Sequence, residues 1–312
     1  MYFPYLRGRQ NELLALRELI CNDLLGQHVI PIIEPVKLSA TLVKTIAEFV
    51  KKEHSISIIM NPSVGSFSND MKDTEKDSYK ANFLSLIEND LIIKAHIMKE
   101  NSAKQLKYFE DQGIKKSEWL IINNNRDYLS IYEKEFETIY PKYVLIPDES
   151  VFRRRVKRHR VLLDDKFVKQ SRNVDYINTS DESFSDDHLY YKDDGFEGFA
   201  DYSVIGNEYQ ESGFLPYAVV IHIVYFASDK SLRIRHFVSD SNDDNSNPAK
   251  KFYEAVQKLA KWYKKESVEL TLGLQTFLEH YNQKTYPGLG SIKKLSIMHH
   301  LELMGKYLDE VD

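Results

Sequence analysis

Carboxylate and amide side chains follow several short apolar runs of this chain. They are Glu34 after Val29–Ile33, Asn61 after Ser57–Met60, Asp148 shortly after Tyr143–Ile146, Asp164 after Val161–Leu163, and Asp201. If the runs are parallel strands, their carboxyl ends meet at one rim and bring these oxygen atoms together. Such oxygens suit Mg²⁺, which takes one or two carboxylates together with water and a ligand phosphate. The pattern predicts a rim site with Glu34, Asp148 and Asp164 as catalytic candidates and Asn61 as a ligand contact.

Helix capping is the alternative explanation, since acids after a strand commonly cap the next helix. Glu34 does not fit this alternative, because Pro35 follows it and no helical pattern begins for several residues. Lys94 does not fit it either. It stands inside the apolar run Leu91–Ile97, where a lysine must reach a partner. We therefore expect Glu34 and Lys94 to share one pocket at the carboxyl ends of the strands, with Lys94 as a catalytic amine.

Two arginines, Arg7 and Arg9, flank Gly8 just before a helical pattern begins. Guanidinium groups at a helix N-terminus are suited to hold an anion, so both are candidate ligand contacts. Packing of the N-terminal arm, or closure of a barrel, is the alternative role.

A short, strongly basic stretch covers Arg153–Arg160. Arg153 and Arg155 are candidate contacts to a phosphate, a nucleotide or a nucleic-acid backbone. The alternatives are pairing with the acidic stretch Asp175–Asp201 or a solvated helix face. The stretch itself lacks the interleaved aromatic residues expected of a platform that stacks single-stranded bases.

Two histidines occur in neighbouring apolar runs, His222 in Tyr217–Phe226 and His236 in Leu232–Val238. If Phe226 pairs with Leu232 across a five-residue loop, antiparallel register places His222 opposite His236. Two imidazoles in this position, with Asp240 nearby, are candidates to bind a metal ion or to share a proton. The alternative is a pair of core histidines bonded to backbone groups.

The elements that must position these residues alternate between strand and helix. Six strand-like runs are separated by helical patterns, which predicts a mostly parallel sheet. With Phe199–Ile205 and Tyr217–Phe226 the count reaches eight, the number of a TIM barrel. We predict an α/β, TIM-barrel-like (β/α) fold with an added antiparallel hairpin and a C-terminal helical segment; the alternative is an open mixed sheet.

The predicted domain organisation follows from the same rhythm. A barrel-like domain covers residues 1–248 and contains a charged insertion near 165–200. Residues 249–312 form helices that pack on the same domain.

Composition narrows the classes of function. The 312 residues carry a formal net charge of −5, which argues against non-specific coating of nucleic acid but leaves room for a local basic patch. Cys21 is the only cysteine, which fits a reducing cytoplasm, and its helical apolar setting predicts a buried thiol. No apolar stretch approaches membrane-spanning length, so we expect no membrane segment. The chain has no phosphate-cradling glycine loop, nucleophile elbow, zincin motif or kinase motifs.

Three segments resemble the bacterial Beta-protein family. They are the opening Tyr2–Gln10 (YFPYLRGRQ), the pair Tyr217–Tyr225 and Ile234–Asp240, and Lys293–His300. The resemblance covers nearly the whole chain, and none of the segments is a catalytic signature. It implies a barrel-like α/β fold, a setting among phage-defence or mobile-element genes, and a protein partner encoded nearby.

Two hypotheses of function follow. The first is a barrel enzyme or binding protein for a phosphate-bearing ligand, a nucleotide or a nucleic acid, with Mg²⁺ as the candidate cofactor. The second is a non-catalytic interaction or regulatory protein of a defence system that holds its partner through charged segments. A mixture of acids and bases at one rim favours the first, and scattered acids that each cap a helix favour the second.

Overall fold

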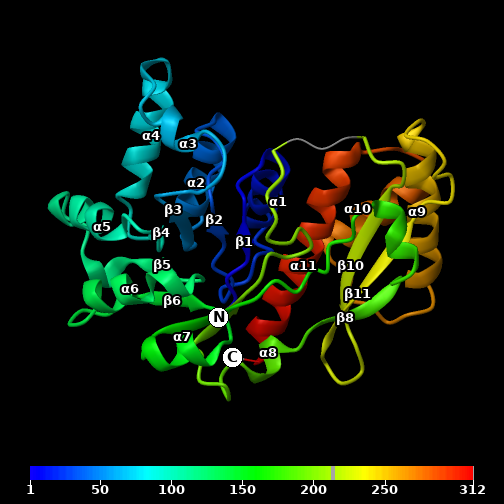
Figure 1. Ribbon diagram of the computed structural model, residues 1–312. Coiled ribbons are helices and arrows are strands. Elements are labelled where there is room, and N and C mark those ends of the chain that lie inside the picture. The colour runs from blue at the N-terminus through cyan, green and yellow to red at the C-terminus, as the bar shows by residue number, and fades with distance from the viewer. Residues whose placement is uncertain (212–214, 312) are drawn as a thin grey trace. The chain divides into compact units, whose positions relative to one another are not determined.

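A computed structural model describes residues 1–211 and 215–311 (Figure 1). The chain divides into two compact units, each assembled from segments that are distant in sequence. The barrel unit comprises Met1–Arg9, His28–Asp165 and Tyr190–Asp201. The second unit comprises Gln10–Gln27, Lys166–Leu189 and Tyr202–Asp312.

Eight parallel strands make the barrel. In sheet order they are β1 (Tyr5–Leu6), β2 (Ile32–Ile33), β3 (Ile56–Ile59), β4 (Ile92–Ile97), β5 (Leu120–Ile122), β6 (Tyr143–Ile146), β7 (Arg160–Leu163) and β9 (Gly198–Ala200). Backbone hydrogen bonds join the last strand to the first: the Phe3 amide donates to the Phe199 carbonyl at 2.8 Å and the Tyr5 amide to the Asp201 carbonyl at 2.8 Å. The strands therefore form a nearly closed, TIM-barrel-like sheet, as predicted.

Helices and single turns connect these strands. Within the barrel unit they are α2 (Ala40–Lys51), α3 (Phe67–Asp70), η1 (Thr74–Lys76), α4 (Asp77–Ile87), α5 (Ser102–Asp111), η2 (Lys116–Glu118), η3 (Arg126–Tyr128), α6 (Leu129–Glu135) and α7 (Ser150–Arg155). Helix α2 shows why such a segment folds. The Ser39 hydroxyl accepts from the Leu42 amide at its N-terminus, and Leu42, Ile46 and Phe49 bury one apolar face.

Side chains alternate between the interior of the barrel and the side of the helices. The rings of Phe3 and Tyr143 meet at 4.9 Å although their strands are not neighbours, so both point into the interior. Residues that pair in register on parallel strands point the same way, and residues one position apart point oppositely. His96 contacts Trp119, which packs on Phe109 of α5, so His96 points toward the helices.

The second unit contains a three-stranded antiparallel sheet. Its order is β10 (Val220–Phe226), β11 (Leu232–Val238) and β8 (Asp181–Ser185). On one face Trp262 of α9 (Pro248–Tyr263) packs on Tyr225 and Phe237. On the other face Tyr307 of α11 (Leu289–Val311) packs on Phe226. The predicted hairpin and C-terminal helices are therefore present, arranged as a helix–sheet–helix sandwich.

The remaining helices of this unit are α1 (Gln10–Cys21) and α10 (Leu272–Gln283), with the turn η4 (Asn173–Ile177); the short α8 (Asp187–Tyr190) lies at the end of the segment Lys166–Leu189. Helix α1 packs on α11 through buried leucines. Among the described residues, no helix is both long and apolar enough to cross a membrane.

One of the eight predicted barrel strands is assigned wrongly, and one barrel strand was missed. The run Tyr217–Phe226 lies in the antiparallel sheet, and the eighth barrel strand is Tyr5–Leu6. A two-residue strand is too short to produce a periodic signal, whereas the hairpin strand is as apolar as a barrel strand. The acidic stretch is also more ordered than a loop, because it contributes β8 and β9. Cys21, expected to be buried, is the exposed last residue of α1.

Candidate functional site

Glu34 is completely buried at the carboxyl end of β2. Its Oε2 accepts from the Tyr5 hydroxyl at 2.7 Å and from the Arg7 guanidinium, with which it forms an ion pair. Its Oε1 accepts from the Ser63 amide at 2.6 Å. Gly8, at φ 62°, lets the chain after Arg7 pass against the backbone of Glu34 and Pro35. The strand ends of β1, β2 and β3 thus converge on one carboxylate.

Lys99 adds a second cation at the carboxyl end of β4. Its ammonium donates to the Asn61 carbonyl at 2.7 Å. Burial lowers the pKa of Lys99, and the negative charge of Glu34 partly opposes that shift. Asn61 fixes the arrangement, because its side chain bonds both the amide and the carbonyl of Ile97 at 2.8 and 2.9 Å. Asn61 therefore ties β3 to β4 and presents its carbonyl to Lys99.

The expectation that Glu34 and Lys94 share a pocket is wrong. Lys94 is in register with Ile58 and lies two residues from His96, on the face of the sheet that is turned to the helices. Glu34 lies two residues from Ile32, in register with Tyr5, on the interior face. The two side chains leave the sheet on opposite faces because strand residues alternate.

The other predicted acids bond to other residues than Glu34 does. Asp148 is exposed and pairs with Arg153 at 3.2 Å. Asp164 is exposed, and its carboxylate accepts from the Asp165 amide at 2.8 Å. Asp201 is buried at the end of β9, where it accepts from the Tyr2 hydroxyl at 2.7 Å. The first two contacts are local in sequence, whereas the third joins residues 199 positions apart where the last strand meets the first.

The predicted Mg²⁺ site does not fit this donor set. Both oxygens of Glu34 already accept hydrogen bonds from protein donors, one of them the Arg7 cation. Across residues 1–211 and 215–311, no group of three or more His, Cys, Asp or Glu side chains is placed to hold a metal ion.

The basic stretch pairs mainly with nearby acids. Arg155 bonds Glu133 of α6 at 2.9 Å, and Arg153 bonds Asp148. With the acidic stretch, Arg160 contacts the Gly195 carbonyl at 2.8 Å and the ring of Phe196, and these contacts involve no carboxylate. Arg9, the other predicted arginine contact, is half-buried beside Gly8 and lies outside the basic stretch.

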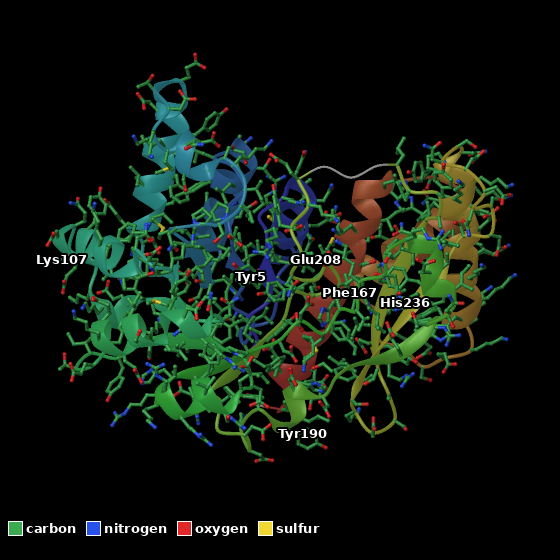
Figure 2. The ribbon with its side chains drawn as sticks, viewed as in Figure 1. Tyr5, Lys107, Phe167, Tyr190, Glu208 and His236 are labelled. Carbon is green, nitrogen blue, oxygen red and sulfur yellow. The ribbon has the colours of Figure 1, made fainter. Side chains whose placement is uncertain are left out.

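The predicted register of the histidine hairpin is confirmed. Phe226 pairs with Leu232, and His222 pairs with His236. The two Nδ1 atoms lie 2.7 Å apart, and His236 Nε2 lies 3.2 Å from Glu182 Oε1. Phe167 packs on both rings, at 5.0 and 6.4 Å between centroids, and Figure 2 labels Phe167 and His236 side by side.

This spacing belongs to an N–H···N hydrogen bond. Two nitrogen ligands of one tetrahedral zinc ion, each bonded at 2.0–2.1 Å, would lie roughly 3.3 Å apart. Burial, with His236 and Lys293 adding to it, holds the pKa of His222 well below its usual value. Burial also lowers the pKa of His236, against the opposing effect of Glu182. Both imidazoles are therefore neutral at pH 7, and the 2.7 Å contact requires one Nδ1 to donate to the other, while Glu182 lies against His236 Nε2.

Sequence reasoning missed Lys99, Tyr5, Ser63 and Asn123. Lys99 and Asn123 obey the strand-end pattern that selected Glu34, since each follows its strand by one or two residues. Asn123 is fully buried, and neither its side-chain oxygen nor its nitrogen has a hydrogen-bond partner among the described residues. The pattern was available for both, whereas the Tyr5 and Ser63 contacts depend on how the strand ends meet.

No protein-family model matches the chain, and no curated protein is significantly similar to it.

Proposed function

We propose that the carboxyl-terminal rim of the barrel binds a phosphate-bearing ligand through Arg7 and Lys99. The observation that carries the proposal is the fully buried Glu34, which holds Arg7 directly and attracts Lys99 from the end of β4. This is also the end at which barrels of this architecture place ligands.

The charge balance favours an anion. Arg7 and Lys99 supply two positive charges beside the single negative charge of Glu34, and Arg9 adds another in the segment after β1. The negative charge of Asp201 lies at the end of β9, where the Tyr2 hydroxyl bonds it. Glu34 fixes the guanidinium of Arg7, whose side chain stays 14% exposed and so reachable by a ligand. A planar guanidinium binds phosphate in bidentate fashion, and an ammonium contributes a point charge. Acids and bases therefore mix at this rim, which favours ligand binding over the partner-holding alternative.

The proposal is tested by calorimetric titration of inorganic phosphate, pyrophosphate and a nucleoside triphosphate. Lys99→Met removes the amine at the rim, and Lys94→Met removes a lysine of the same strand on the outer face. We expect the Lys99 variant to lose about tenfold or more in affinity, which corresponds to about 1.4 kcal/mol. The Lys94 variant should bind as the wild type does; equal losses in both variants would contradict the proposal.

Arg7 needs a paired control, because Arg7→Gln leaves the buried Glu34 without its ion pair. That loss costs roughly 3–5 kcal/mol of stability for a buried pair. The double variant Arg7→Gln/Glu34→Gln removes both charges and should recover most of the stability while phosphate affinity stays low. Folded protein with unchanged phosphate affinity would remove Arg7 from the site.

The setting in a bacterial phage-defence or mobile-element system is part of the proposal and rests on the family resemblance. A reducing, cytoplasmic location belongs with it and rests on the single cysteine. Phage plating on cells that carry the wild-type gene or the Lys99→Met gene tests the setting, and loss of protection is the expected result. The alternative of a non-catalytic protein that holds a nearby-encoded partner predicts protection that survives this substitution.

A further inference from the structure

A surface hollow of about 510 Å³ lies between α6 and the basic stretch. Its lining includes Tyr132, Phe136 and Tyr140 from α6 and the segment after it, and Arg155 and Lys157 from the basic stretch. Tyr140 precedes β6 and Lys157 precedes β7, so both segments lead into the amino ends of strands. In a parallel barrel this is the end opposite Glu34, and the hollow is separate from the rim.

The cations around this hollow fall into two groups. Arg155 is neutralised by Glu133. Lys134, Lys157 and Arg158 are exposed, and within the described part of the chain none of them forms an ion pair, although Lys157 is near enough to Glu133 to help lower the pKa of that carboxyl. The lining contains two acids, Glu133 and Glu137. Glu133 pairs with Arg155, and Glu137 is exposed. The unpaired charge at the hollow is therefore positive.

The tertiary structure also supplies the aromatic residues that the basic stretch lacks in sequence. The guanidinium of Arg158 lies over the ring of Tyr140, 4.8 Å from its centroid. Tyr140 is 38% exposed, while Tyr132 and Phe136 are buried beneath. An exposed guanidinium–aromatic stack gives a nucleobase a flat surface to extend, and the neighbouring lysines give its phosphates a partner.

We propose that this hollow binds single-stranded nucleic acid, with a base extending the Arg158–Tyr140 stack and the backbone phosphates on Lys134 and Lys157. The volume lies in the range of pockets for small organic ligands, which is enough for one nucleotide of a strand. The net charge of −5 confines such binding to a local patch. The hollow is built from outer helices and loops at the end of the barrel that does not carry catalytic sites, which suits binding rather than chemistry.

Fluorescence anisotropy with labelled single strands of about 12 nucleotides tests the proposal, using DNA and RNA versions and a duplex of the same length. Single strands should bind, and the duplex should bind more weakly because its bases are already stacked. Duplex binding as tight as that of either strand would overturn the stacking contact. Absence of strand binding at low salt would overturn the whole proposal.

A triple variant, Lys134→Gln/Lys157→Gln/Arg158→Gln, removes the unpaired cations. The slope of log affinity against log salt should fall by about 1.4, since Lys134 and Lys157 each lose one phosphate contact and each such contact to a single strand contributes about 0.7. The matched control Lys44→Gln/Lys72→Gln/Lys104→Gln removes the same charge from exposed lysines outside the hollow. If the control lowered the salt slope equally, the effect would come from net charge, and the proposed binding site would be wrong.

Two single variants separate stacking from charge. Tyr140→Ala should weaken strand binding about tenfold without changing the salt slope, and Tyr140→Phe should retain it. Glu137→Gln removes the remaining acid of the lining and should strengthen binding. Unchanged affinity in both Tyr140→Ala and Glu137→Gln would contradict the assignment of this hollow.

Discussion

At the scale of single residues, this protein buries several ionisable groups and satisfies them in two ways. For Glu34, hydrogen bonds from Arg7, Tyr5 and the Ser63 amide compensate the loss of water. Three buried histidines instead give up their charge. Burial is the main cause that lowers the pKa of His96 and His300 to about 3 and of His299 to about 4.

Acidification should therefore destabilise the protein well before its carboxylates are protonated. The folded pKa of each histidine is depressed, so the unfolded chain binds protons below pH 6.5 that the folded chain does not. The stability is present above pH 6.5 and is lost as the pH falls toward the folded values. At pH 5 each histidine contributes a loss of up to about 2 kcal/mol. Urea unfolding at pH 7 and pH 5 measures the difference.

The variant His299→Gln tests whether His299 contributes to this pH dependence. The quantity compared is the change in unfolding free energy between pH 7 and pH 5, not the stability at either pH. The substitution removes one titrating group, so the loss between pH 7 and pH 5 should shrink even if the variant is less stable at both values. If the variant lost as much unfolding free energy between pH 7 and pH 5 as the wild type, His299 would not contribute to the pH dependence.

At the scale of elements, close backbone approach sets how α10 and α11 cross. A Cβ on Gly273 would lie 2.4 Å from the Leu295 carbonyl and 2.8 Å from the His299 amide. His299 is held at this crossing by Thr271 at 2.7 Å and by the Val224 carbonyl at 2.6 Å. The glycine therefore lets α11 approach while keeping this histidine between α10 and β10.

Gly273→Ala should destabilise the protein although alanine is the better helix former. Overpacking of this kind costs roughly 1–3 kcal/mol, against a gain of up to about 1 kcal/mol from helix propensity. The unfolding free energy in urea should therefore fall. Gln275→Ala, on the exposed side of the same helix, should stay within about 0.5 kcal/mol of the wild type. A stabilised Gly273→Ala variant would contradict the close crossing.

At the scale of the whole molecule, the chain passes between its two units several times. Helix α1 belongs to the second unit although it follows the first barrel strand, and it packs on α11 from the far end of the chain. Cutting the chain at one point therefore divides a unit instead of separating two domains. The hairpin β10–β11 likewise depends on α9 and α11, which cover its two faces.

A chain of residues 1–248 should lose the ordered hairpin. Removal of α9, α10 and α11 exposes both faces of the sheet and the buried leucines of α1. Amide hydrogen exchange should show β10 and β11 unprotected in this truncation and protected in the full chain. A control ending at Asp309 removes only residues beyond the buried part of α11 and should keep the protection.

The sequence by itself determined the alternation of strands and helices, seven of the eight barrel strands, the histidine register and the charged character of the strand ends. These features arise from local periodicity and from the fixed geometry of a hairpin, which neighbouring residues specify. Glu34 was identifiable for the same reason, because the residues next to it exclude helix capping.

Only the tertiary structure decided which polar groups meet. Lys94 and Lys99 lie five positions apart on one strand and its end, yet alternation turns Lys94 to the helices while Lys99 reaches the Asn61 carbonyl at the rim. Tyr140 meets Arg158 because two separate loops enter adjacent strands. Such encounters depend on contacts between distant segments, whose geometry no local pattern of residues contains.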